Sequence, residues 1–298
     1  MFKYFCILVW IIISIGQPVL SDCLPTPEMK EIPEEIYVEI HPTAITSIDE
    51  MTSTFDYQFY LGYSFETEEA NSYCSLKLDD LKGIFDPSFE FSNAISAKRL
   101  TPYWVEIEDY EVYVEVKYGG TFKGEFDFTF YPFDKQSLHI DLTSFYSIDD
   151  LDIELEEQNI TALDNLEVAG WDVKGFQSQA SIKTYFGDDE EYQVIKYSKD
   201  LNRNSMSMTF RFFHPLFVLV SLNFLSLRLK REDFETKIEI QLAVIISIAA
   251  YSIIMDTKIP DLHYLTIADA IMTVVFLSSA SLLAFSIIKK RISDDENS

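Results

Sequence analysis

From residue 206 to residue 291 the chain consists of three long apolar spans joined by short polar connections. A transmembrane helix needs about 20 consecutive, mostly apolar residues, so each span is long enough to cross a lipid bilayer. We expect helices over about residues 206–229, 235–256 and 264–290. Because the composition changes abruptly after Arg203, the sequence predicts a membrane protein in two parts, residues 22–205 and residues 206–291.

The second apolar span carries two acidic residues that a lipid-facing helix would not tolerate. Glu235 and Glu239 lie one helical turn apart near its start. An ionised side chain in hydrocarbon costs roughly 2.5 kcal/mol or more, so these carboxylates must face water or protein. They share one helical stripe with small and aliphatic residues, and this stripe would suit one wall of a cation pore: Glu235, Glu239, Ala243, Ile246, Ala250 and Ile253. Alternatively, the glutamates only pair with Lys237 or Lys230 in a structural bundle.

The net charge of −26 lies in the polar part of the chain. Residues 22–205 contain 13 Lys and Arg against 39 Asp and Glu, a difference that equals the net charge of the whole chain. Such a field repels nucleic acid and attracts cations. We therefore expect no nucleic-acid partner.

Two features place this acidic part outside the cell. Residues 1–21 have a basic start, an apolar stretch and a small-residue pattern typical of a cleaved signal peptide, with an uncleaved anchor helix as the alternative. Basic residues follow the first and third spans and assign both places to the cytosol: Arg228, Lys230, Arg231, Lys289, Lys290 and Arg291. We expect a multi-pass plasma-membrane protein with an extracellular N-terminal domain and a short cytosolic tail, residues 292–298.

Residues 22–205 contain many short segments typical of β-strands, such as 36–40, 55–60, 110–116 and 126–130. Many strands in one domain predict an all-β sandwich of the immunoglobulin-like class. The expected fold is this sandwich followed by an α-helical bundle of three transmembrane helices. The sequence has no Gly-rich phosphate loop, spaced Cys/His cluster or nucleophile elbow, so we expect neither an enzyme nor a cofactor.

The cysteines and one sequon bear on export. Cys6 lies in the predicted signal peptide, whereas Cys23 and Cys74 either pair in an oxidising compartment or remain thiols. Asn159 begins the sequence Asn-Ile-Thr, a glycosylation sequon that agrees with export.

The segment YPFDKQ at residues 131–136, followed by SLHI, resembles the signature loop of pentameric ligand-gated ion channels, the Cys-loop receptor superfamily. Eukaryotic members close this loop with a disulfide, where this chain has Gly124 and Leu138. The resemblance is therefore to the branch without the bridge, as in the bacterial proton-gated channels. Further landmarks follow in the family's order: Trp104, Trp171, Arg203, Pro215, Pro260 and Tyr264.

The resemblance implies a homo- or heteropentamer of identical or related subunits, embedded in lipid, whose second helices line a central pore. Glu235 and Glu239 would then form acidic rings that select monovalent or divalent cations, and each ring would titrate as a coupled set. Ile246 and Ile253 would form hydrophobic collars that stop ions when the pore narrows.

The resemblance also implies a coupling site at the membrane boundary. By position, Glu50, Asp134 and Arg203 would form a charge cluster that holds two arrangements of similar free energy. Pro260 and Tyr264, after the pore helix, would receive the movement. Alternatively, Asp134 and Arg203 form only a fixed structural pair.

Family ligands bind between subunits, beneath a hairpin that corresponds to residues 183–196. Aromatic side chains can hold a small amine there by cation–π attraction, and the candidates are Tyr57, Tyr110, Phe145, Tyr146, Tyr185, Phe186 and Tyr192. The acidic runs at 188–191 and 149–152 suggest protons or Ca²⁺ as other triggers, although an acidic run is also typical of a solvated surface.

Family subunits have a fourth transmembrane helix, whereas this chain stops at Ser298. Truncation or a natural three-helix form would each explain this. The leading hypothesis is a cation-selective channel subunit opened by an extracellular ligand. The alternative is a non-conducting subunit or ligand-binding decoy, while a membrane-tethered adhesin would leave the glutamate stripe unexplained.

Overall fold

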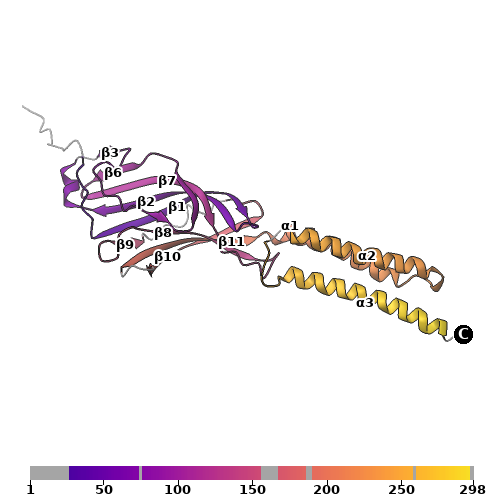
Figure 1. Ribbon diagram of the computed structural model, residues 1–298. Coiled ribbons are helices and arrows are strands. Elements are labelled where there is room, and N and C mark those ends of the chain that lie inside the picture. Colours follow the sequence, from indigo (N-terminus) through magenta and orange to yellow (C-terminus); the bar gives the residue numbers. More distant parts are fainter. Residues whose placement is uncertain (1–26, 74–75, 156–166, 186–189, 258–259, 296–298) are drawn as a thin grey trace, which may run out of the picture.

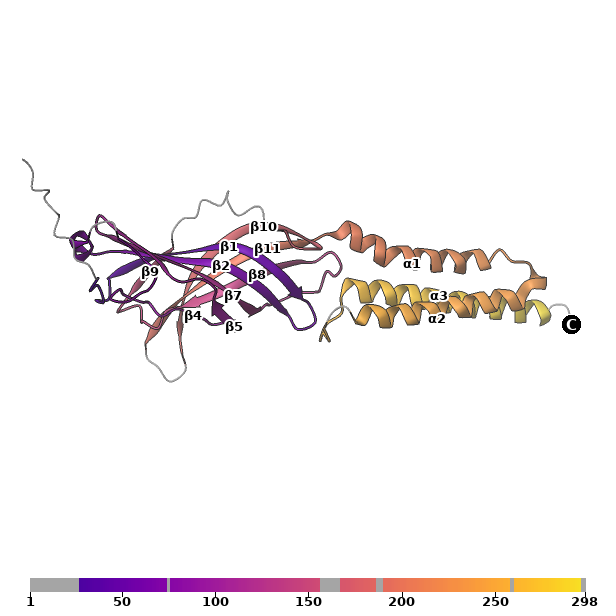
Figure 2. The same cartoon turned by 90° about the horizontal axis from the view of Figure 1, so that it is seen from above.

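The computed structural model describes residues 27–73, 76–155, 167–185, 190–257 and 260–295. A two-sheet β-sandwich occupies one end of the molecule, and three helices run side by side at the other (Figure 1). Viewed from above, the helices continue the long axis of the sandwich (Figure 2). The predicted fold class, a β-sandwich followed by three apolar helices, is confirmed.

The larger sheet has seven strands, in the order β3-β6-β7-β2-β1-β9, with β5 also paired to β7. Its long strands are antiparallel neighbours: β1 (Glu35–Asp49), β2 (Thr54–Glu66) and β7 (Glu111–Lys123). A 3₁₀-helix, η1 (Glu68–Ser72), follows β2. The shorter strands are β3 (Leu76–Leu78), β5 (Ala94–Arg99), β6 (Trp104–Glu108) and β9 (Asp152–Leu155).

The smaller sheet has four strands in the order β10-β11-β8-β4. These are β10 (Trp171–Thr184), β11 (Glu191–Arg203), β8 (Lys135–Thr143) and β4 (Glu90–Phe91). Successive side chains of a strand point to opposite faces, so alternating apolar residues of the two sheets meet in one core. Phe55, Phe59, Leu61, Ile140 and Leu142 are all buried there.

The helices begin directly after the last strand. Helix α1 (Ser205–Ser226) is separated from β11 only by Asn204, and a short turn, η3 (Arg231–Asp233), leads into α2 (Phe234–Asp256). Helix α3 (Ile267–Asp295) returns beside α2. Each helix contains an apolar stretch long enough to cross a membrane: Thr209–Ser226, Phe234–Met255 and Ile267–Ile292.

Two sequence predictions differ from the structure. Residues 126–130 form no strand, because the backbone turns where the Thr129 amide donates to Asp127 Oδ1 (2.9 Å), and Phe128 packs against the helices instead. Helix α3 starts three residues later than expected and runs past 290, since the charged residues that end the apolar span are good helix formers. Residues 1–21, Cys23, Cys74 and Asn159 lie outside the described residues.

Candidate functional site

The segment that resembles the family's signature loop lies between the sandwich and the helices. Phe128 and Tyr131 are buried in an apolar cluster with residues of all three helices. The first amides of α3 also bind this segment: Ile267 donates to the Thr129 carbonyl (3.0 Å) and Ala268 to the Tyr131 carbonyl (3.1 Å). Because the first amides of a helix have no partner within it, the loop caps α3.

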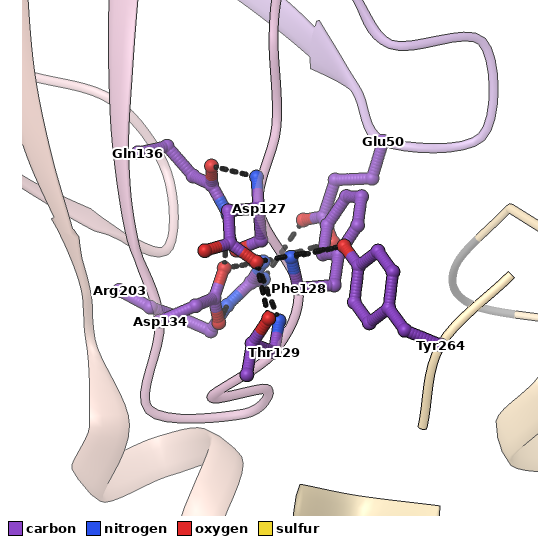
Figure 3. Close-up of polar contacts among 8 residues, drawn as sticks. All are labelled: Glu50, Asp127, Phe128, Thr129, Asp134, Gln136, Arg203 and Tyr264. Carbon is purple, nitrogen blue, oxygen red and sulfur yellow. Dashed lines mark hydrogen bonds and ion pairs between the residues drawn. The ribbon is translucent and has the colours of Figure 1, made fainter. Parts of the chain in front are cut away.

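Arg203, the last residue of β11, binds two carboxylates from separate parts of the sandwich (Figure 3). Its Nε and Nη2 donate to Asp134 at 2.6 and 2.9 Å, and its Nη1 and Nη2 donate to Glu50 at 2.8 and 2.9 Å. The Arg203 and Asp134 side chains are 4% and 1% exposed, whereas Glu50 is 23% exposed. The structure thus brings together the three residues that the sequence placed in a charge cluster.

Two aromatic rings lie against the same guanidinium. The Arg203 Cζ atom lies 4.2 Å from the Trp171 ring centroid and 5.1 Å from that of Tyr131. Burial alone would lower the pKa of Arg203, but its hydrogen bonds with Asp134 and Glu50 outweigh burial and raise that pKa. The guanidinium is therefore a permanent positive charge in a pocket built for it.

Gln136 connects this cluster to the neighbouring turn. Its Nε2 donates to Asp134 Oδ2 (2.6 Å) and to the Asp127 carbonyl (2.9 Å), while its Oε1 accepts from the Asp127 amide (3.0 Å). The side chain is only 5% exposed. Gln136 therefore fixes the position of Asp127 relative to Asp134.

Tyr264, in the connection between α2 and α3, contacts that turn. Its hydroxyl accepts from the Phe128 amide (3.0 Å) and lies 3.5 Å from Asp127 Oδ1. Hydrogen bonds from Thr129, with a smaller one from Tyr264, lower the pKa of Asp127, so its carboxylate stays ionised at neutral pH. Polar contacts thus run from Glu50 through Arg203, Asp134, Gln136 and Asp127 to Tyr264 (Figure 3).

Arg203 has two carboxylate partners, so it can lose one of them while the other still neutralises its charge. Asp134 is buried in the loop, whereas Glu50 belongs to the turn after β1. Separating Glu50 from Arg203 would let β1 move relative to β11 while the Asp134 pair persists. An interface with two such arrangements can transmit movement between the sandwich and the helices.

Sequence reasoning did not find Gln136, Asp127 or the stacking of Trp171. Gln136 lies inside the recognised motif, so its position was a usable signal. Trp171 stacks because it stands directly opposite Arg203 in the register of β10 and β11, which the sequence alone does not reveal. Pro260, another predicted coupling residue, is partly buried in the connection to α3.

The six residues of the glutamate stripe are all exposed along α2 in the single chain. Ile246 and Ile253 are 67% and 66% exposed. Among the described residues, neither Glu235 nor Glu239 forms an ion pair with a lysine. Their carboxylates are therefore available to water or to another subunit.

The aromatic ligand candidates do not form one group. Tyr185 and Tyr192 contact edge to face across the β10–β11 hairpin, with ring centroids 5.6 Å apart. Phe145 is exposed, and Tyr146 packs on Phe85 at 5.4 Å. Tyr110 is exposed in the turn between β6 and β7, and Phe186 lies outside the described residues.

Tyr57 differs from the other aromatic candidates in its burial. Its side chain points from β2 into the sandwich core and is 5% exposed, between Phe55 and Phe59. Burial raises the pKa of its hydroxyl well above the usual range. The register of β2 turns this ring inward, and the sequence alternation was compatible with either face.

Comparison with known proteins supports the resemblance. No family model matches the chain. The chain is 22% identical over 270 residues to a protein named "Proton-gated ion channel" from Gloeobacter violaceus, a match that covers 88% of this chain and 74% of that protein. The recognised resemblance is therefore confirmed, as is the prediction that the chain is not an enzyme. Together with the three apolar helices, the match identifies a membrane protein.

Proposed function

We propose that this chain, a relative of the pentameric ligand-gated ion channels, is a subunit of a cation-selective pentameric channel of the plasma membrane with an extracellular sandwich. The observation that carries the proposal is the polar network between sandwich and helices. A permanent, buried arginine binds two carboxylates from different connecting segments of the sandwich, and the network ends on the connection between α2 and α3. A sandwich that only anchored the helices would need no such charged relay.

The proposed pore is lined by α2. The exposure of the whole stripe from Glu235 to Ile253 supports this, since each of its residues is accessible for lining a shared aqueous axis. In a pentamer Glu235 and Glu239 would give two acidic rings, which attract cations. Ile246 and Ile253 would close the pore by dewetting when the helices approach.

We propose protons as the activating ligand. The related protein is named as proton-gated, and the acidic sandwich offers many carboxylates whose charge an acid pulse changes. Small amines at Tyr185 and Tyr192, and Ca²⁺, are the alternatives that the same assay separates.

The test is to express the full chain, step the external pH from 7.5 to 5, and measure the reversal potential in NaCl gradients. We expect an acid-evoked current that reverses near the sodium potential. Reversal at the chloride potential would contradict cation selectivity. A current evoked by an amine or by Ca²⁺, with none from acid, would replace protons as the ligand.

A further inference from the structure

The helix bundle buries polar side chains from all three helices towards the end remote from the sandwich. Asn223 of α1 is 1% exposed, Gln241 of α2 is fully buried, and Ser286 of α3 is 3% exposed. Polar side chains are rare in membrane-spanning helices, and those that occur usually face the bundle interior and serve a function. These three residues take no part in the network at the sandwich.

The three side chains lie at about the same depth in the bundle. Gln241 Nε2 donates to Ser286 Oγ at 3.2 Å, which fixes α2 against α3. Between α1 and α2, the Tyr251 hydroxyl donates to the Phe212 carbonyl at 3.1 Å. These two helices are antiparallel, and each rises about 1.5 Å per residue. Leu222 comes ten residues after Phe212 on α1 and Gln241 ten residues before Tyr251 on α2, so Leu222 and Gln241 lie at about the same depth. Asn223 is next to Leu222 and thus lies within about one turn of Gln241.

At this depth, α1 has a buried hydrogen-bond donor and α2 a buried acceptor that have no partner among the described residues. Asn223 Nδ2, Asn223 Oδ1 and Gln241 Oε1 are buried and have no partner among the described residues. A buried amide without a partner is costly, and the bilayer offers none. Since one orphan is a donor on α1 and another is an acceptor on α2, a rotation or slide between these helices that brings the two amides together would satisfy both.

We propose that Asn223, Gln241 and Ser286 form a hydrogen-bonded layer that joins the three helices in a second arrangement of the bundle. The structure described above is the arrangement in which Asn223 has not yet paired. If α2 lines the pore, as the proposed function holds, the layer holds the pore helix against α1 in one gating state. Two packings that differ by one interhelical contact are typical of such transitions.

The first test is a double-mutant cycle on the proton concentration for half activation, using Asn223→Leu, Gln241→Leu and both. We expect each single change to shift this concentration. The shift in the double variant should differ from the product of the two single shifts by about threefold. This factor is equivalent to the roughly 0.6 kcal/mol of a typical interhelical hydrogen bond in a membrane. Ser221→Leu with Ser281→Leu is the matched control. Both serines are exposed and bond only carbonyls of their own helices, so their shifts should multiply.

The second test needs no current and so separates this proposal from the proposed function. Asn223→Cys with Gln241→Cys is oxidised in detergent at pH 7.5 and pH 5, and the cross-linked peptide is quantified by mass spectrometry. Because less thiolate is present at pH 5 than at pH 7.5, each rate is divided by that of Gln241→Cys with Ser286→Cys, whose side chains are already in contact. We expect this ratio to differ between the two pH values, whereas the exposed Ser221→Cys with Gln241→Cys stays unlinked. Single shifts that simply multiply, a cross-link that never forms, or a rate ratio that is equal at both pH values would overturn the proposal.

Discussion

At the residue scale, Arg203 determines whether the junction between sandwich and helices holds. It is buried against Trp171 and bound to Asp134 and Glu50. Removing one partner of a buried ion pair costs about 3–5 kcal/mol, because the other charge is left unpaired. We expect Arg203→Gln to lower the free energy of unfolding by this amount and to reduce assembly. Thermal unfolding and size measurement in detergent check this, with exposed Arg99→Gln expected to change stability by less than about 1 kcal/mol.

Substitution of Glu50 tests whether its contact with Arg203 changes during gating or is only structural. Because Asp134 still compensates Arg203, we expect Glu50→Gln to assemble normally and to shift the proton concentration for half activation. An assembled Glu50→Gln channel with wild-type activation would mean that the cluster is only structural, the alternative that the sequence left open.

Tyr264 is the contact of the α2–α3 connection with the same network. Tyr264→Phe removes the acceptor of the Phe128 amide, and one lost hydrogen bond is worth about 0.5–1.5 kcal/mol. We expect a shift in half activation of about two- to tenfold, with assembly intact. Tyr37→Phe, exposed near the start of β1, is the control, and an equal shift in both variants would argue against a role at the junction.

His139 predicts a pH dependence of stability. Burial lowers its pKa, with Lys196 adding to the effect and Asp141 opposing it. The unfolded chain, with a histidine pKa of about 6.5, therefore binds a proton before the folded chain does, and stability falls as the pH drops from about 6.5 towards the folded pKa. We expect melting temperature to decline over this window, less steeply in His139→Gln, and unchanged in slope for exposed His263→Gln. Equal slopes in the wild type and His139→Gln would contradict this.

At the scale of the element, α2 presents Glu239 to its surroundings without an ion-pair partner among the described residues. If this carboxylate lines the pore, Glu239→Gln halves the acidic charge that the two rings present and should weaken block by divalent cations. Concentration–block curves for Ca²⁺ measure this, with the exposed Glu232→Gln before the helix as control. An unchanged curve for Glu239→Gln would remove that residue from the conduction path.

The sequence predicted the type of an element correctly where the hydrophobic pattern of that element is long. The apolar spans of the helices and the alternation of β1, β2 and β7 are long, so the element types were correct. The segment 126–130 has the same alternation but lies in a loop, because its buried aromatic side chain, Phe128, packs on the helices rather than on a facing sheet. Its partners are more than 80 residues away along the chain, and local pattern cannot reveal them.

In the candidate site, the sequence predicted those residues whose positions follow from the family's signature motif. The resemblance of residues 131–136 led to Glu50, Asp134 and Arg203, which the structure brings together. The aromatic candidates had no such anchor, and the sequence did not reveal that Tyr57 lies in the core, because strand alternation does not state which face is buried. Asn223 and Gln241 were not noticed at all, since single amides in an apolar span change the hydropathy little.

At the scale of the whole molecule, we propose that the chain is one fifth of a channel, in which the acidic sandwich, the polar network from Glu50 to Tyr264 and the pore helix α2 act together. The α2 helices of the five copies would then surround one aqueous axis. The most direct measurement is an electron cryomicroscopy structure of the purified assembly. We expect five subunits with the Glu235 and Glu239 carboxylates facing the shared axis. Carboxylates that face lipid, or that stay enclosed within one subunit, would contradict a pore lined by α2.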